Sequence, residues 1–128
     1  MTDKKIYNFE DLDVWKEGRL LRLEIDKILK KLPVDEKYCL KSQMIRASRS
    51  ITNNIAEGYG RFHYQENIQF CRQSRGSAYE IMDDLIICMD NNYINNEEYK
   101  ELRNKCNSVI KLLNGYINFL KKQKEMEK

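Results

Sequence analysis

Residues that interrupt helices are scarce in this chain of 128 residues, in which Pro33 is the only proline and glycine occurs 5 times. Proline and glycine break helices and form the tight turns that β-proteins need, so their scarcity argues against an all-β fold. The chain also has no linker rich in glycine and serine. A length of 128 residues fits a single domain, and 41% hydrophobic residues can form one core. So small a domain would gain stability from burying more surface in an oligomer.

Long apolar runs are absent as well. No stretch approaches the roughly 20 residues that a membrane-spanning helix needs, and the N-terminal residues Met1–Lys5 lead into no apolar signal-peptide core. We therefore expect a cytoplasmic protein with no membrane contact.

Residues that bind metals or perform catalysis are few. The only histidine is His63, and Gly60 stands three residues before it, where a di-iron bundle has a glutamate. A Ser-His-Asp catalytic triad would also have to use this one histidine. The segment Gly58-Tyr59-Gly60 follows a predicted helix and not a strand, which argues against a phosphate-binding loop. We therefore predict no catalytic residue, no metal and no cofactor, and a protein that is not an enzyme.

The cysteines are widely spaced, without a Cys-x-x-Cys pair. This spacing suggests neither a zinc motif nor a disulfide framework, and buried reduced thiols are the expectation. The four are Cys39, Cys71, Cys88 and Cys106.

Apolar residues recur with helical spacing in four segments. The first helix is predicted to end at Pro33, the second to run from an N-cap near Asp35 to about Tyr59, and the fourth to begin at Asn95, with Glu98 completing a capping box. The predicted core positions are Val14, Gly18, Leu21, Ile25, Ile28 and Leu32; Met44, Ser48, Ile51 and Ile55; Phe70, Ser74, Ser77, Ile81, Leu85 and Cys88; and Tyr99, Leu102, Cys106, Val109, Leu113, Tyr116 and Leu120. Trp15 is also assigned to the core or to a subunit interface.

Short connections between four helices favour antiparallel neighbours, so the predicted fold is all-α, an antiparallel up-down-up-down four-helix bundle. We assign residues 9–122 to the bundle, 1–8 to a flexible N-terminus and 123–128 to a frayed basic C-terminal tail.

Positive charge is concentrated in the middle of the chain. Residues 41–76 carry 6 basic and 2 acidic side chains, which gives +4, against a total of +3. Two pairs of arginines have i, i+3 spacing, and a hairpin turning at Arg61 would bring the pairs near each other. Arginine suits phosphate, and Tyr59, Phe62 and Tyr64 can stack on unpaired bases. The candidate contacts with RNA or DNA are Arg46, Arg49, Arg61, Arg72 and Arg75.

The same arginines have a structural alternative. The hairpin would place Arg46 and Arg49 level with Ser74 to Asp83, where Glu80, Asp83 and Asp84 can pair with them, within one subunit or between subunits. Asn54 and Glu57 are similarly expected to satisfy polar groups at a helix–helix junction rather than to form a site.

One long motif identifies a family. It comprises Gln43, Arg46-Ala47, Ser50-Ile51 and Asn54-Ile55-Ala56-Glu57-Gly58-Tyr59-Gly60-Arg61, and Gly58 is expected to close its helix in a left-handed conformation. The motif resembles that of the four-helix-bundle family encoded by intervening sequences in 23S ribosomal RNA genes. Shorter similarities to the family lie at Phe9–Trp15, Leu32–Tyr38 and Gly76–Glu80. We predict that the motif residues from Ser50 to Tyr59 have structural roles.

The resemblance implies an all-α protein that forms a homo-oligomeric ring, of five subunits as in homopentameric relatives, and a link to RNA. It supplies no catalytic residue. More distant relatives are accessory subunits of the reverse transcriptases of diversity-generating retroelements. The sequence differs from the family pattern at Arg49 and Thr52-Asn53, which places an extra charge at a predicted interface.

Two functions remain open at this stage: an oligomeric scaffold associated with nucleic acid, or an adaptor that presents a helical face to a partner protein such as a reverse transcriptase. An enzyme would need a site that the sequence does not reveal.

Overall fold

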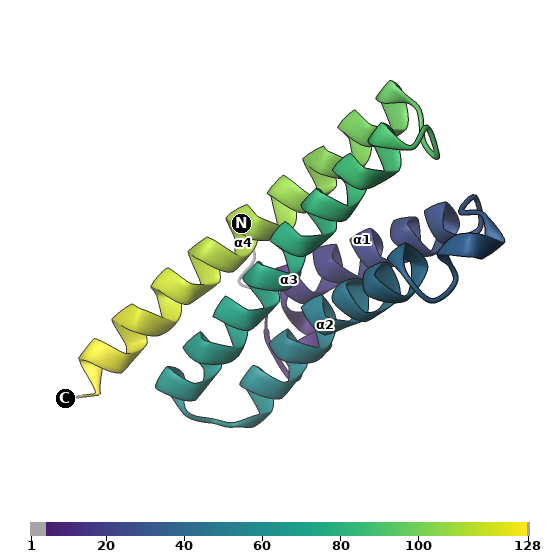
Figure 1. The fold of residues 1–128 in the computed structure, drawn as a ribbon. Coiled ribbons are helices and arrows are strands. Elements are labelled where there is room, and N and C mark those ends of the chain that lie inside the picture. Colours follow the sequence, from purple (N-terminus) through teal and green to yellow (C-terminus); the bar gives the residue numbers. More distant parts are fainter. Residues whose placement is uncertain (1–4, 128) are drawn as a thin grey trace.

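The structure, a computed structural model, describes residues 5–127, and every regular element in that range is helical (Figure 1). Two short 3-10 helices, η1 and η2, precede the long helices α1 and α2. The elements are η1 (Phe9–Asp11), α1 (Asp13–Leu29), η2 (Val34–Glu36), α2 (Leu40–Gly60), α3 (Tyr64–Asp90) and α4 (Asn96–Met126).

The helices pack in sequence around one core, so the predicted all-α, up-down bundle is confirmed. Each helix contacts the next, and α1 also contacts α4, which closes the bundle. Figure 1 shows α3 and α4 as a long hairpin beside the shorter hairpin of α1 and α2. The C-terminal end of α4 lies near the start of α3, where the Lys124 ammonium donates to Gln65 Oε1 at 2.6 Å.

The buried side chains follow the predicted spacing in α1 and α2, and in α4 except at Tyr99 and Tyr116, which are only half-buried and pack against the core. All six core positions predicted between Val14 and Leu32 are buried, and the Asn95–Glu98 capping box forms. In α3 the predicted Phe70 and Ser77 are only half-buried, and their neighbours Cys71 and Ala78 are buried instead. The fully buried large side chains include Leu21, Ile25, Met44, Ile51, Ile55, Ile68, Ile81, Leu85, Val109 and Leu113.

The predicted start of the second helix was wrong. Asp35 lies in η2 and α2 begins only at Leu40, because the chain after Pro33 forms i to i+3 hydrogen bonds and the backbone of Cys39 is not helical. The Glu36 carboxylate accepts from the Leu40 amide at 3.4 Å and from the Tyr93 hydroxyl at 2.8 Å. Glu36 therefore connects the start of α2 to the α3–α4 connection.

Gly58 does not have the predicted left-handed conformation. It is buried inside α2, and the positive φ angle at this turn belongs to Phe62, at 59°. A Cβ atom added to Gly58 would lie 2.7 Å from Asn67 Oδ1 and 2.9 Å from Phe70 Cβ. Glycine is therefore needed here for the close approach of α2 and α3.

The ends of the chain also differ from expectation. α4 continues to Met126, so residues 123–126 of the predicted frayed tail are helical, with Lys124 anchored on Gln65. Residues 1–4 of the predicted flexible N-terminus lie outside the described residues, while the amides of Tyr7 and Asn8 donate to the Asp11 carboxylate.

Three of the four cysteines are buried, as expected, and burial raises the pKa of the Cys71, Cys88 and Cys106 thiols to about 12, 11 and 12. Cys39 is exposed, contrary to expectation, because it lies in the connection before α2. Trp15 packs on the core with Phe9 edge-on, at 5.3 Å between ring centroids. No helix in residues 5–127 combines the length and apolar character required to cross a membrane.

Candidate nucleic-acid interface

The long motif lies at the junction of α2 and α3. Ser50 and Ser77 hydroxyls are 2.8 Å apart across the junction, and the Asn54 amide donates to the Ser50 carbonyl and hydroxyl, both at 2.8 Å. One turn away, the Ser74 hydroxyl donates to the Ile51 carbonyl at 2.8 Å. Asn54 thus satisfies groups at a helix–helix junction, whereas Glu57 is exposed and pairs with Arg61, the residue just after α2, at 3.0 Å.

Two of the candidate arginines lie on the outer side of α2. Arg46 and Arg49 are exposed and line a surface groove of about 770 Å³, which we call the α2 groove. Its other lining residues are Lys37, Tyr38, Lys41, Ser42, Ile45, Ser50 and Asn53. Among the described residues that line it, four are cationic and none carries a carboxylate.

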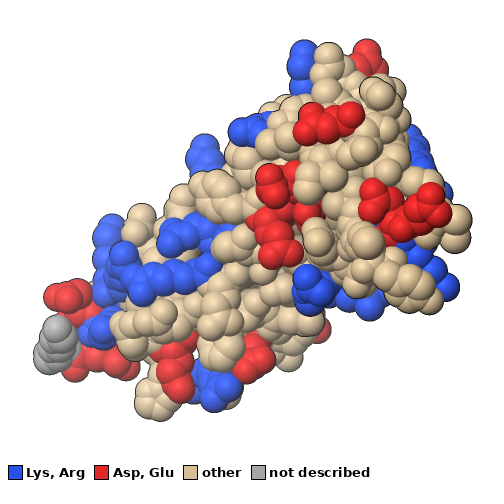
Figure 2. Space-filling view, in the orientation of Figure 1, with Lys and Arg blue, Asp and Glu red and all other residues tan. Residues whose placement is uncertain are grey.

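Arg72 lies in a different groove, of about 380 Å³, formed between α3 and α4. This α3–α4 groove is lined by Gln65, Ile68, Arg72, Lys121, Lys122, Lys124 and Glu125. Figure 2 shows blue atoms gathered over the C-terminal half of α4 and the adjoining part of α3, and red atoms gathered further along α3. One turn beyond Arg72, the Arg75 guanidinium donates to Asn114 Oδ1 at 2.7 Å.

The five candidate arginines therefore do not form one patch. Arg61 lies at the α2–α3 turn, paired with Glu57 and stacked over Phe70 at 5.1 Å from the ring centroid. The three lysines of the α3–α4 groove are not among the predicted contacts, because the pattern after Leu120 predicts a frayed basic tail rather than a helix. Their helical spacing after Leu120 was the signal that could have placed them.

The predicted ion pairs of Arg46 and Arg49 do not form within this subunit. Among the described residues, no ion pair within 4 Å joins either arginine to Glu80, Asp83 or Asp84. Asp84 is buried, and its Oδ2 atom has no hydrogen-bond partner among residues 5–127. The pKa of Asp84 is raised to about 7 by burial and then by Glu80 and Asp83, against the attraction of Arg46. Arg46 thus acts on Asp84 through space rather than by direct contact.

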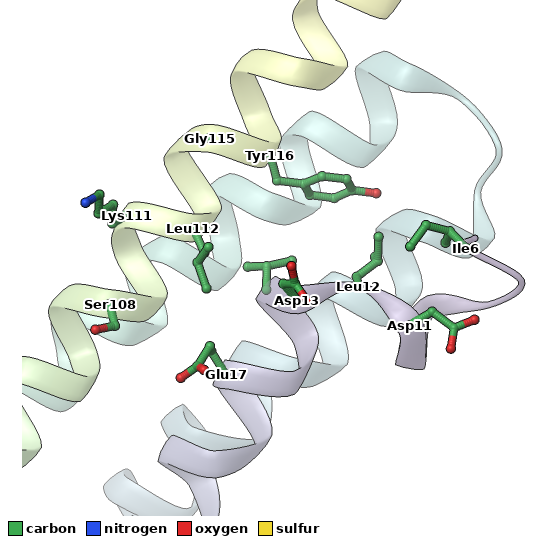
Figure 3. Close-up of a pocket in the computed structure, with 11 residues that line it drawn as sticks. Ile6, Asp11, Leu12, Asp13, Glu17, Ser108, Lys111, Leu112, Gly115 and Tyr116 are labelled. Carbon is green, nitrogen blue, oxygen red and sulfur yellow. The ribbon is translucent and has the colours of Figure 1, made fainter. Parts of the chain in front are cut away.

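A third hollow of about 690 Å³ separates the start of α1 from α4 (Figure 3). Asp13 and Glu17 on α1 lie across it from Leu112 on α4, and Asp11 completes a set of three carboxylates. Three carboxylates and one cation, Lys111, line this hollow, so it is less suited to phosphate than the two basic grooves. No group of three or more metal-ligating side chains is assembled within residues 5–127.

Aromatic rings gather where the α2–α3 turn meets α4. A pocket of about 390 Å³ there is lined by Ile6, Leu12, Tyr59, Phe62, His63, Tyr64, Asn67, Tyr116, Phe119, Leu120 and Glu127. We call it the aromatic pocket. It contains all three turn aromatics that the sequence analysis singled out, together with two rings from α4.

These features define an up-down four-helix bundle with two basic grooves on its surface. Residues 10–115 match the 23S rRNA-intervening sequence protein family, and the chain belongs to that family. Its fold is similar to that of a protein of unknown function from the S23 ribosomal protein family of Bacteroides thetaiotaomicron, with a TM-score of 0.74 and 24% identity over 81% of this chain and 97% of the other. No curated protein matches the chain.

Proposed function

We propose that this chain is a non-enzymatic, self-associating scaffold that binds nucleic acid in the cytoplasm. The observation that carries the proposal is the presence of two basic grooves whose lysines and arginines form no ion pair within 4 Å with the described residues. Arg46, Arg49 and Arg72 have no carboxylate within 4 Å among the described residues. Arginine and lysine side chains held open in grooves are suited to the phosphates of RNA or DNA.

Self-association into a ring, of five subunits as the family resemblance implies, is the second part of the proposal. It is supported by apolar side chains that this subunit leaves uncovered: Leu20 and Leu23 on α1 are 49% and 42% exposed. A second copy would bury such residues. A light-scattering mass near five times 15.4 kDa supports the ring, and a monomer contradicts it.

The binding test is a titration of labelled RNA at several salt concentrations, with the Arg72→Glu/Arg75→Glu variant alongside the wild type. Phosphate contacts predict that affinity falls with salt and that the variant binds more weakly with a shallower salt dependence. Unchanged affinity and unchanged salt dependence in the variant would remove these residues from the interface.

The same exposed leucines of α1 favour a second candidate, an adaptor that binds a partner protein such as a reverse transcriptase. Affinity purification separates the two functions. One stoichiometric protein without nucleic acid would favour the adaptor, and nucleic acid released by high salt would favour the scaffold.

A further inference from the structure

We propose that the nucleic acid is single-stranded: one unpaired base enters the aromatic pocket, and the adjoining phosphates follow the α3–α4 groove. This inference rests on the proposed function and narrows it to a class of ligand and a place on the fold.

The aromatic pocket has rings placed for stacking. Tyr59 and Phe62 have ring centroids 6.3 Å apart, and Tyr116 and Phe119 are 6.3 Å apart with nearly parallel planes, 11° from each other. Phe62 is 85% exposed and Phe119 is 52% exposed, so at least half of each side chain is accessible to solvent. A volume of about 390 Å³ is at the lower end of the range for small-ligand pockets, roughly 300–1,000 Å³.

The backbone of Phe62, in the turn between α2 and α3, has a strained conformation that leaves the ring exposed. Its φ angle of 59° lies in the left-handed region, which a bulky residue adopts only when the surrounding structure imposes it. Such strain is concentrated at functional sites. Burial of this ring in the core does not compensate for the strain, because the ring is exposed.

The pocket also offers a polar group for the edge of a base. The Asn67 amide donates to the Tyr116 hydroxyl oxygen at 3.1 Å, and burial raises the pKa of Tyr116 to about 12. Because the Tyr116 hydroxyl oxygen accepts from Asn67, the hydroxyl proton is left to donate to a carbonyl oxygen of a base.

A continuous surface joins the rings to the cations. His63, Tyr64 and Glu127 line both the aromatic pocket and a shallow hollow beside it, and Gln65 and Lys124 line both that hollow and the α3–α4 groove. Carboxylates also lie along this route, namely Glu66, Glu125 and Glu127. Cations and carboxylates alternate along it: Lys124 lines the hollow with Glu66 and Glu127, and Glu125 lines the α3–α4 groove. In that groove the cations outnumber the carboxylate, with Arg72, Lys121, Lys122 and Lys124 against Glu125.

Rings next to a basic groove are the two elements of single-strand recognition, since stacking takes an exposed base and the cations follow the backbone. In a duplex the base faces are stacked and unavailable, so a duplex can use only the cations. The α2 groove lacks this combination: Tyr38 is its single aromatic residue, and Lys37 lies over that ring at 5.3 Å.

The test compares labelled oligouridine with an RNA duplex of equal length, using Phe62→Asn/Phe119→Ala as the variant. Asparagine tolerates the left-handed backbone, so the turn is retained without the ring. Stacking is worth enough per base that we expect oligouridine affinity to fall about tenfold or more. Duplex affinity should be unchanged. Tyr38→Ala, an equally exposed ring in the α2 groove, is the matched control and should bind oligouridine like the wild type.

Circular dichroism and thermal melting of each variant establish that the bundle is folded, and Phe119→Tyr, which keeps a ring, should bind like the wild type. Equal loss for single strand and duplex, or no loss in the ring variant, overturns this inference while the proposed function stands. Absence of binding to both RNAs overturns the proposed function and this inference together.

Discussion

The two basic grooves carry similar charge but are built differently. The α2 groove takes all of its lining residues from one helix and the turn before it, whereas the α3–α4 groove combines residues that are about 50 positions apart in the sequence, such as Arg72 and Lys121. The α2 groove ends without an aromatic cluster, and the α3–α4 groove continues toward the aromatic pocket. The charge of the two grooves is therefore similar, and the difference between them is the aromatic pocket next to the α3–α4 groove.

The largest expected effect is on the α3–α4 groove. Arg72→Glu/Lys121→Glu/Lys122→Glu should weaken single-stranded RNA binding by about 100-fold, because three phosphate contacts become repulsions. Fluorescence anisotropy at fixed low salt measures this. A loss below about threefold would place the main contacts elsewhere.

The Asp84 carboxyl of α3, whose pKa is affected by the charge of Arg46 in the α2 groove, offers a second test. Its pKa in the folded chain is about 7, well above that of an unfolded aspartate, so the folded state holds the proton more tightly. The free energy of unfolding should therefore fall as pH rises from about 4 to about 7. Asp84→Asn should remove most of this slope and stabilise the chain on the order of 2 kcal/mol at pH 8.

Urea unfolding at pH 5 and pH 8 measures that prediction. Asp83→Asn, which neutralises an exposed neighbour, is the control and should leave most of the slope in place. An Asp84→Asn variant with the wild-type slope would show that Asp84 is ionised in the folded chain at neutral pH.

Gly58 tests the packing beneath the aromatic pocket. Gly58→Ala should destabilise the bundle by about 1–2 kcal/mol net, because overpacking against Asn67 and Phe70 outweighs the better helix propensity of alanine. Gly76→Ala is the matched control: no atom lies within 4 Å of the added Cβ, and we expect stabilisation of up to about 1 kcal/mol. Equal changes in melting temperature for the two variants would contradict the conclusion that Gly58 is required by the close packing of α2 and α3.

The smallest effect should come from the α2 groove. Arg46→Glu/Arg49→Glu should weaken single-stranded RNA binding by about threefold, because the variant loses long-range electrostatic attraction but no stacking contact with a base. The preference for single strand over duplex should not change. A larger loss here than in the α3–α4 groove would reverse the comparison, and parallel titrations of the two variants decide it.

Local patterns predicted the bundle well and its assembled surfaces poorly. The core spacing of α4 and the Asn95–Glu98 capping box depend on residues three and four apart, so the sequence reveals them directly. The start of α2 depends on whether the chain after Pro33 forms the 3-10 helix η2 or an α-helix. The need for glycine at position 58 depends on how closely α3 approaches α2. The α3–α4 groove requires knowing that Lys121 and Lys122 face Arg72, which only the folded hairpin shows.

The central claim is that the α3–α4 groove holds phosphates. It is tested most directly by the salt dependence of oligouridine binding to the unmodified chain. The four cations of the groove predict a linear fall of log affinity against log salt with a slope of about −2 to −3, since each single-strand phosphate contact contributes about −0.7. Saturable binding with no salt dependence, or no binding at low salt, would contradict the account.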